Sequence, residues 1–286
     1  VAFMPITYDP QHRLFKLDTN LSTYAFMVYE ENYLVHLYYG AKIPDTDLSY
    51  LMYRSWFSSQ NPYNPNIEDP RFSPDITPME YATNGAGDYR IAALSARNSN
   101  GDSVTDVRYV SHKIYDGKPS LPGLPATFDR EGKAQTLEVV LVDRVTGVRA
   151  VLLYGVLPEY DVITRSVRIV NAGSGRISVK KLAPACLDLL GGDYDYITFY
   201  GRHAMERNVQ RMPIGHGVSK IGSLRGTSSH QYNPAVIVAE HDATEDAGGC
   251  YAMAFVYSGG FQSEAGKDQY YQTRVLMGFS EEQFAY

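Results

Sequence analysis

The sequence is poor in cysteine, in tryptophan and in clustered positive charge, and each shortage excludes a class of protein. Its 286 residues include two cysteines, Cys186 and Cys250, which are too few for a disulfide framework and too far apart for a CxxC metal site. Lys and Arg total 26 against 32 Asp and Glu, and no run of five basic residues occurs, which argues against nucleic-acid binding. We therefore expect a small or neutral ligand and reduced thiols.

Targeting and membrane signals are missing as well. No stretch approaches the roughly 20 consecutive apolar residues that a membrane-spanning helix needs. The first residues, "VAFMPITYDPQ", lack the basic region and apolar core of a signal peptide. These observations predict a cytoplasmic protein without a membrane partner.

Strand signals dominate what is present. Tyrosine, a strand former, occurs 24 times against 11 phenylalanines. From Thr136 onward four β-rich runs follow one another, separated by "DRVTG", "LPEY" and "NAGSG", and in "VRAVLLYGV" Val148, Ala150, Leu152 and Tyr154 share one face. Short strands with turns between them predict an all-β sandwich with very little helix. The best helical candidate, Gly201 to Met212, has only a partial apolar stripe.

Two segments interrupt the strand pattern. Ser58 to Tyr89 carries five prolines and several aromatic residues, including Tyr63 and Phe72, and we expect an ordered arm that contacts a partner or a site. The second segment, "YDGKPSLPGLPATFD", is rich in proline and is expected to cross the surface.

The stretch "RGTSSHQYNPAVIV" concentrates reactive residue types without the spacing of a catalytic centre. Ser228, Ser229 and His230 are adjacent, and neighbouring side chains of an extended segment point to opposite faces. We interpret these hydroxyl and amide groups as partners of the backbone where the chain enters a strand.

No cofactor or metal is expected from the motifs. The seven histidines show no zinc-like spacing, "NSNGDSVTD" lacks the terminal Glu of a calcium loop, and no nucleotide-binding glycine motif opens a helix.

Several motifs in conserved order and spacing resemble a known family. They are "YLVHLYYG", the run from Val104 to Gly173, "RGTSSHQYNP" and "VYSGGFQSE". Together they resemble the amino-terminal domain of α-galactosidases in glycoside hydrolase family 36. The resemblance implies that residues 1–286 form one large antiparallel two-sheet β-supersandwich. It also implies that "SSHQ" is structural, and that a (β/α)8 barrel and a small β-domain lie elsewhere in the intact enzyme.

The resemblance also implies retaining hydrolysis of terminal α-galactosides such as raffinose and melibiose, in the barrel and not in this chain. Retention needs two carboxyl groups about 5–5.5 Å apart. In the family the nucleophile lies in a Lys-Trp-Asp run, whereas the only tryptophan here is Trp56 in "RSWFSS". We therefore expect no catalytic residue in this chain, an inactive fragment, and the barrel as its partner.

Two further expectations come from the family. Its sandwich normally continues beyond the strand region that ends here at Tyr286, so an unpaired edge is expected to cause association or marginal stability. Its members are homo-oligomers in which a β-domain loop leans over a neighbour's barrel. The matching loop is 47–75, where Tyr53 stands in place of a carboxylate and Arg71 matches the family's arginine.

Two other functions remain open from the residues. A lectin-like sandwich would stack sugars on Tyr63 and Trp56. A sugar mutarotase would need an acid and a base, for which His112 and a carboxylate on a neighbouring strand are the candidates.

Overall fold

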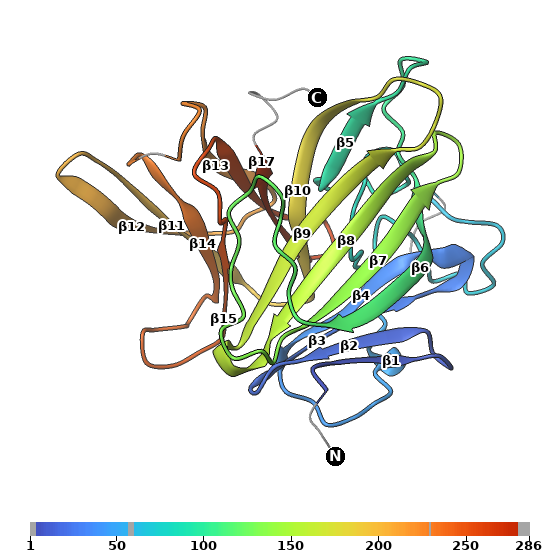
Figure 1. Cartoon of the computed structure of the whole chain (residues 1–286), viewed down its shortest axis with the longest axis horizontal. Coiled ribbons are helices and arrows are strands. Elements are labelled where there is room, and N and C mark those ends of the chain that lie inside the picture. The colour runs from blue at the N-terminus through green and yellow to red at the C-terminus, as the bar shows by residue number, and fades with distance from the viewer. Residues whose placement is uncertain (1–3, 57–59, 229, 280–286) are drawn as a thin grey trace. The chain divides into compact units, whose positions relative to one another are not determined.

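The structure is a computed structural model that describes residues 4–56, 60–228 and 230–279 (Figure 1). Seventeen β-strands and three 3₁₀ helices of three residues each form the regular structure of these residues, which include no α-helix. The prediction of an all-β chain with very little helix is confirmed. None of the described helices is long and apolar enough to cross a membrane.

The contacts within the chain divide it into two compact units. The first comprises Val1–Tyr89 and Asn98–Ile177, and the second comprises Arg90–Arg97 and Ser178–Tyr286.

The first unit contains two four-stranded antiparallel sheets, ordered β1-β2-β3-β4 and β6-β7-β8-β9. The strands of the first sheet are β1 (Ile6–Asp9), β2 (Leu14–Asp18), β3 (Ser22–Val28) and β4 (Leu34–Ala41). Those of the second sheet are β6 (Val107–Asp116), β7 (Gln135–Asp143), β8 (Val148–Leu157) and β9 (Val162–Asn171). The 3₁₀ helices are η1 (Glu30–Asn32), η2 (Ser49–Leu51) and η3 (Pro158–Tyr160).

The second unit contains a five-stranded sheet, β13-β16-β17-β10-β5, and a four-stranded sheet, β12-β11-β14-β15. The first of these consists of β13 (Gly217–Ser223), β16 (Phe261–Lys267), β17 (Thr273–Phe279), β10 (Ser178–Leu189) and β5 (Leu94–Arg97). The other consists of β12 (Met205–Pro213), β11 (Tyr194–Arg202), β14 (Tyr232–Glu240) and β15 (Cys250–Ala254).

The expectation of one large two-sheet supersandwich is wrong, because the strands pair into four separate sheets of four or five strands each. Alternation along a strand tells which side chains are buried but not which strand lies beside it. Bulges contribute to the division into four sheets. The pairing register of β10 shifts between Val179 and Lys181 and again between Leu182 and Ala185. A bulge bends a strand and increases its twist, and strongly twisted sheets split rather than widen.

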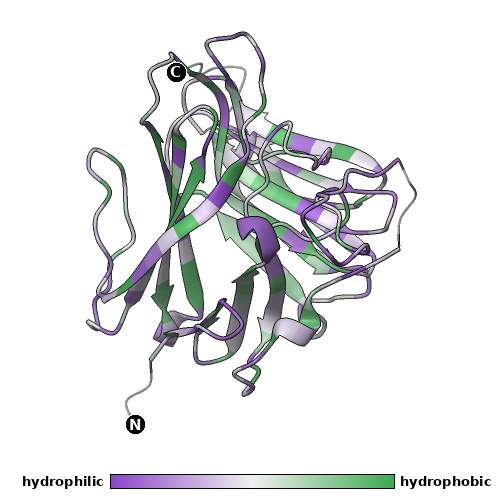
Figure 2. Cartoon of the chain, turned by 90° about the vertical axis from the view of Figure 1, so that its right-hand side faces the viewer, coloured by the Kyte–Doolittle hydropathy of each residue, from purple (hydrophilic) through white to green (hydrophobic). Residues whose placement is uncertain are grey.

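The strands predicted from Thr136 onward are confirmed as β7 to β10, with turns at the three predicted places. The predicted inner face of β8 is also confirmed, since Val148, Ala150, Leu152 and Tyr154 are at most 1% exposed. Bands of apolar and polar residues alternate along the strands in Figure 2. The segment between β6 and β7 is mostly exposed or half-buried, as expected for a connection that crosses the surface.

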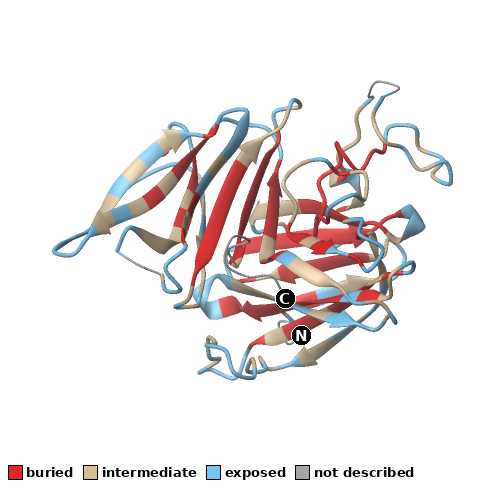
Figure 3. Ribbon diagram, turned by 90° about the horizontal axis from the view of Figure 1, so that it is seen from above, coloured by how far each residue is buried: buried red, intermediate tan, exposed pale blue. Residues whose placement is uncertain are grey.

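The helical candidate Gly201 to Met212 is wrong, because this segment is the end of β11, a turn and the strand β12. Arg202 pairs with Met205 across a two-residue turn, in which Ala204 has a φ of 60°. Tight hairpin turns need such positive φ values, which a helix does not accommodate. The resulting hairpin is largely solvent-exposed toward its tip (Figure 3).

Aromatic side chains join the two sheets of the first unit. Phe26 of β3 stacks on Tyr154 of β8 with ring centroids 5.1 Å apart. Phe15 of β2 meets the His112 ring of β6 edge-on at 4.8 Å, and Tyr8 of β1 lies 4.3 Å from the same ring. Large rings bury the most apolar area per residue, so these contacts form the centre of this core.

A carboxylate is buried beside this aromatic core. Glu80 is 0% exposed and accepts hydrogen bonds from the hydroxyls of Tyr24 and Tyr154, at 2.7 Å each. The Arg165 guanidinium lies 3.2 Å from one carboxylate oxygen, and the Nδ1 atom of His36 lies 3.0 Å from the other. Burial, and next the negative charge of Glu80, raise the pKa of Tyr24 well above its ordinary value. The buried charge is thus paired and hydrogen-bonded from strands of both sheets, as such a charge must be.

The second unit has its own buried polar contacts. Arg274 of β17 donates two hydrogen bonds to Asp188 of β10, at 2.6 and 2.8 Å. The Tyr196 hydroxyl of β11 donates to Ser263 of β16 at 2.7 Å, which connects the two sheets of this unit. Burial raises the pKa of Tyr196 above its ordinary value, so this hydroxyl remains a donor.

Replacing Glu80 by Gln tests the buried network. The variant removes the buried charge that faces the Arg165 guanidinium and accepts from two tyrosine hydroxyls, so the free energy of unfolding should fall by about 3–5 kcal/mol. The measurement is urea unfolding of the 286-residue chain.

The matched control is Glu138→Gln, which breaks a surface ion pair between Glu138 and Lys113. This change should cost about 1 kcal/mol or less. Equal losses in the two variants would show that the Glu80 network does not hold the first unit together.

Candidate functional site

The long segment between η2 and β5 is anchored to the core of the first unit. Phe72 is 2% exposed, and its ring lies 5.2 Å from that of Tyr29 and 4.9 Å from that of Tyr33. Leu48 and Met52, at the other end of the loop, belong to the same buried cluster. Phe72, in the middle of the expected arm, is therefore packed in the same cluster as the residues that precede the arm. Residues 57–59, which include the predicted start of the arm at Ser58, lie outside the described residues.

Asp69 organises the charged part of this loop. Arg71 donates to both of its carboxylate oxygens, from Nε and Nη2 at 2.9 Å each, and the backbone N–H of Arg71 donates at 3.0 Å. The Nε atom of Arg54 lies 3.0 Å from the same carboxylate. The hydrogen bonds with Arg71 hold the pKa of the Asp69 carboxyl below its ordinary value and raise the pKa of Arg71. A bidentate pair fixes the plane of the guanidinium.

The two residues predicted at the substrate rim lie on neighbouring segments of this loop. Tyr53 is half-buried and Arg71 is exposed, with 45% of its side chain accessible. The backbone N–H of Ser55 donates to the carbonyl of Arg71 at 3.3 Å, which holds the segment that follows Tyr53 beside Arg71.

The loop also displays two aromatic rings. Trp56 is 74% exposed and Tyr63 is 70% exposed, whereas the aromatic residues in the strands of the first unit's sheets are all buried or half-buried. An exposed ring of this kind has a face available to stack against a partner or a ligand.

The candidate for a mutarotase base has a different environment from the one that this reaction requires. His112 packs against Phe15 and Tyr8, and its Nδ1 atom lies 2.7 Å from the hydroxyl of Tyr109. Burial lowers the pKa of His112. The carboxylate on the adjacent strand, Glu138, pairs with Lys113 instead.

The "SSHQ" stretch precedes β14, and of the side chains predicted to bond to the backbone there, the Ser228 hydroxyl donates to the carbonyl of Ser258 at 3.5 Å. Hydroxyl groups just before the stretch bond to the backbone as well. Thr227 donates to the carbonyl of Ser228 at 2.8 Å, and Ser223 donates to the carbonyl of Thr227 at 2.6 Å. The backbone N–H of Ser228 donates to the carbonyl of Ser258 at 2.8 Å. Ser229 lies outside the described residues.

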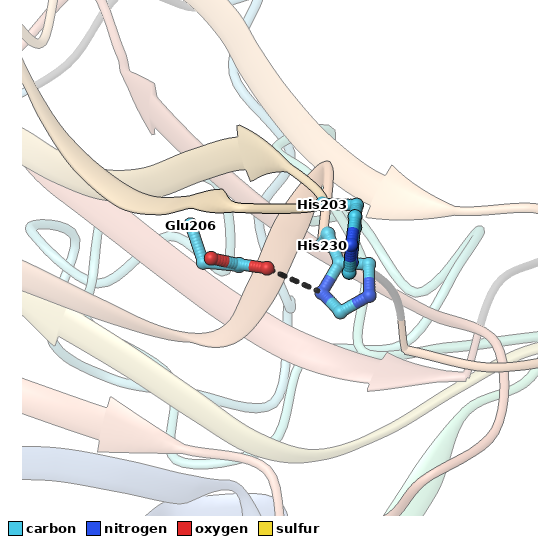
Figure 4. Close-up of side chains that lie close together, drawn as sticks. All are labelled: His203, Glu206 and His230. Carbon is cyan, nitrogen blue, oxygen red and sulfur yellow. Dashed lines mark ion pairs between the residues drawn. The ribbon is translucent and has the colours of Figure 1, made fainter.

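The structure brings together one group that the sequence search missed: His203, Glu206 and His230 (Figure 4). The first two lie on either side of a hairpin turn, which the helical interpretation of Gly201 to Met212 concealed. His230 comes from the segment before β14, which is far from this turn in sequence. Recognising "HA" as a two-residue turn was the only local signal that could have placed His203 near Glu206.

Comparison with known proteins identifies the family. Residues 32–286 match the model of the glycosyl hydrolase family 36 N-terminal domain. The chain is 51% identical over 283 residues to the bifunctional α-galactosidase/sucrose kinase AgaSK of Mediterraneibacter gnavus, covering 99% of this chain and 30% of AgaSK. It is 36% identical over 280 residues to the α-galactosidase AgaA of Geobacillus stearothermophilus, covering 97% of this chain and 38% of AgaA. The chain thus spans about a third of the length of these relatives.

Solved structures agree with the sequence matches. The galactosidase domain of AgaSK superposes with a TM-score of 0.94 at 49% identity, covering 98% of this chain and 39% of that one. A variant of AgaA from Geobacillus stearothermophilus in complex with raffinose superposes with a TM-score of 0.90 at 36% identity, covering 96% and 38%.

Replacing Asp69 by Asn tests whether this carboxylate holds the loop. Chymotryptic cleavage at Tyr63 should become about fivefold faster, equivalent to the roughly 1 kcal/mol of an exposed ion pair. Because the pKa of Asp69 is lowered, the stabilisation is present above the ordinary Asp pKa and is lost as the pH falls through the lowered value.

The control is Glu68→Gln, which neutralises the exposed neighbouring carboxylate. Equal cleavage rates of the wild type, Asp69→Asn and Glu68→Gln would rule out this role of Asp69.

Proposed function

Because the chain belongs to the glycosyl hydrolase family 36 N-terminal domain family, we propose that it is the non-catalytic first part of an α-galactosidase. The observation that carries this proposal is the match of nearly the whole chain to about a third of each relative. The intact enzyme hydrolyses terminal α-galactosides with retention, through two carboxyl groups that a following catalytic barrel supplies. The raffinose complex of the relative AgaA supports an oligosaccharide with a terminal α-galactosyl group as the substrate.

The finer part of the proposal concerns the loop 47–75. In a homo-oligomer, this loop leans over the substrate entrance of a neighbouring subunit's barrel. Support comes from the exposed Trp56 and Tyr63 rings and from Arg71, whose guanidinium is exposed and oriented by Asp69. Asp69 takes two of the five N–H groups of Arg71, and the others suit sugar hydroxyls. Tyr53 lies on the neighbouring segment and offers an aromatic side chain.

An exchange of domains tests the proposed function. The part of AgaSK that matches this chain is replaced by these 286 residues, and hydrolysis of an aryl α-galactoside is measured. The chimera should retain turnover, because the two sequences share 51% identity and superposable folds. The same AgaSK without any N-terminal part serves as the control and should lose activity. A chimera that elutes like AgaSK but lacks turnover would contradict the proposal.

Arg71→Ala in that chimera tests the rim. Loss of one hydrogen bond worth about 1 kcal/mol should lower kcat/KM about fivefold, mainly through KM, since the contact is made equally in the bound and transition states.

The matched control is Arg144→Ala, which removes an exposed arginine from the turn between β7 and β8 of the same unit. An unchanged kcat/KM for Arg71→Ala would remove this residue from the substrate rim, whereas the domain assignment would stand on the exchange experiment.

A further inference from the structure

Three potential metal ligands meet at the tip of the β11–β12 hairpin, away from the loop discussed above in sequence and in a different unit. His203 lies in the hairpin turn, Glu206 follows on β12, and His230 precedes β14. One ligand atom from each residue lies within 4.8 Å of those of the other two. Within the described residues this is the one such group of three or more.

The backbone fixes these three residues near one another. Tyr200 of β11 pairs with Asn208 of β12 on one side and with Tyr232 of β14 on the other. The N–H of Gly201 donates to the carbonyl of Gln231, at 3.2 Å, directly beside His230. The hairpin turn and the start of β14 therefore come to the same end of one sheet, and their proximity does not depend on side-chain rotation.

The three side chains lie close together, with the Glu206 carboxylate directed at the His230 ring (Figure 4). His230 Nδ1 lies 3.8 Å from Glu206 Oε1, and the rings of His203 and His230 are 6.3 Å apart. The backbone N–H of Ala204 donates to Glu206 Oε1 at 2.9 Å, which restrains the carboxylate. The other carboxylate oxygen of Glu206 has lone pairs that can bind a metal ion.

We propose that His203, Glu206 and His230 bind a divalent transition-metal ion of the zinc class. Two imidazoles and one carboxylate form a donor set that zinc accepts, with water in the fourth position, whereas calcium and magnesium prefer oxygen donors alone. Tetrahedral zinc with bonds near 2.1 Å places its ligand atoms about 3.4 Å apart. The ligand atoms must therefore move closer together by roughly 1 Å to bind zinc. Rotation of these exposed side chains permits this movement.

Bound metal would clip the hairpin turn to the segment before β14. A ligand that binds only the folded state stabilises it, by an amount that grows with the logarithm of the ligand concentration once this exceeds the dissociation constant. The site therefore stabilises the most exposed hairpin of the second unit when metal is present. Arg202 and Arg207 flank the turn, and their positive charges repel a divalent cation. The attraction of the three ligands for the metal ion must exceed this repulsion.

The test is titration of the tag-free 286-residue chain with zinc by calorimetry, with cobalt absorption as a second probe. We expect one strong zinc site per chain and the intense visible bands of tetrahedral cobalt. Loss of an outer-shell partner already costs 10–100-fold in affinity at metal sites, so His203→Ala, His230→Ala and Glu206→Gln should each weaken zinc binding at least tenfold.

His216→Ala is the matched control, because His216 is another exposed histidine of the same unit. It should leave zinc affinity unchanged, and magnesium should not compete. Circular dichroism confirms that each variant is folded. Absence of zinc binding, or binding that His203→Ala and His230→Ala leave unchanged, would overturn the proposal.

Discussion

The buried carboxylate of Glu80 is the constraint on which the first unit depends. It comes from an irregular segment, yet its partners lie on β3, β4, β8 and β9, so it joins both sheets. The backbone on either side of it is bound to β4, since the N–H of Glu80 donates to the carbonyl of Leu34 and the N–H of His36 donates to the carbonyl of Pro78. Burying a charge is tolerated only with such complete pairing. The segment that follows the long loop is therefore held in one place.

This anchoring holds parts of the proline-rich loop in place. One end is fixed by Leu48 and Met52, the other by Phe72 and the Glu80 network, and Asp69 orders the middle. The exposed Arg71 lies close to these anchors, where Asp69 orients its guanidinium. Loops of this kind commonly carry binding residues.

Local features of the fold were predictable from the sequence, and pairing between distant segments was not. β-rich runs separated by turn signals identified β7 to β10, and period-two alternation identified the buried face of β8. The same pattern could not reveal that the strands form four sheets. Alternation along a strand depends neither on which strand pairs with it nor on shifts in the pairing register. The hairpin of β11 and β12 was mistaken for a helix, because its exposed strand has little apolar periodicity.

The candidate sites show the same division. The resemblance to family 36 led to Tyr53, Arg71 and the loop 47–75, but the pairing of Arg71 with Asp69 needed coordinates. The group of His203, Glu206 and His230 has no linear spacing that a motif search could detect, because two neighbouring strand pairings bring it together.

The central claim is that this chain serves α-galactoside hydrolysis without carrying the catalytic carboxylates. The most direct measurement is nitrophenol release from an aryl α-galactoside by the purified 286-residue chain, beside the full-length relative AgaA. The account predicts no release above buffer from the folded chain while AgaA is active. Turnover proportional to the concentration of this chain would contradict it, because two reacting carboxyl groups would then lie within these residues.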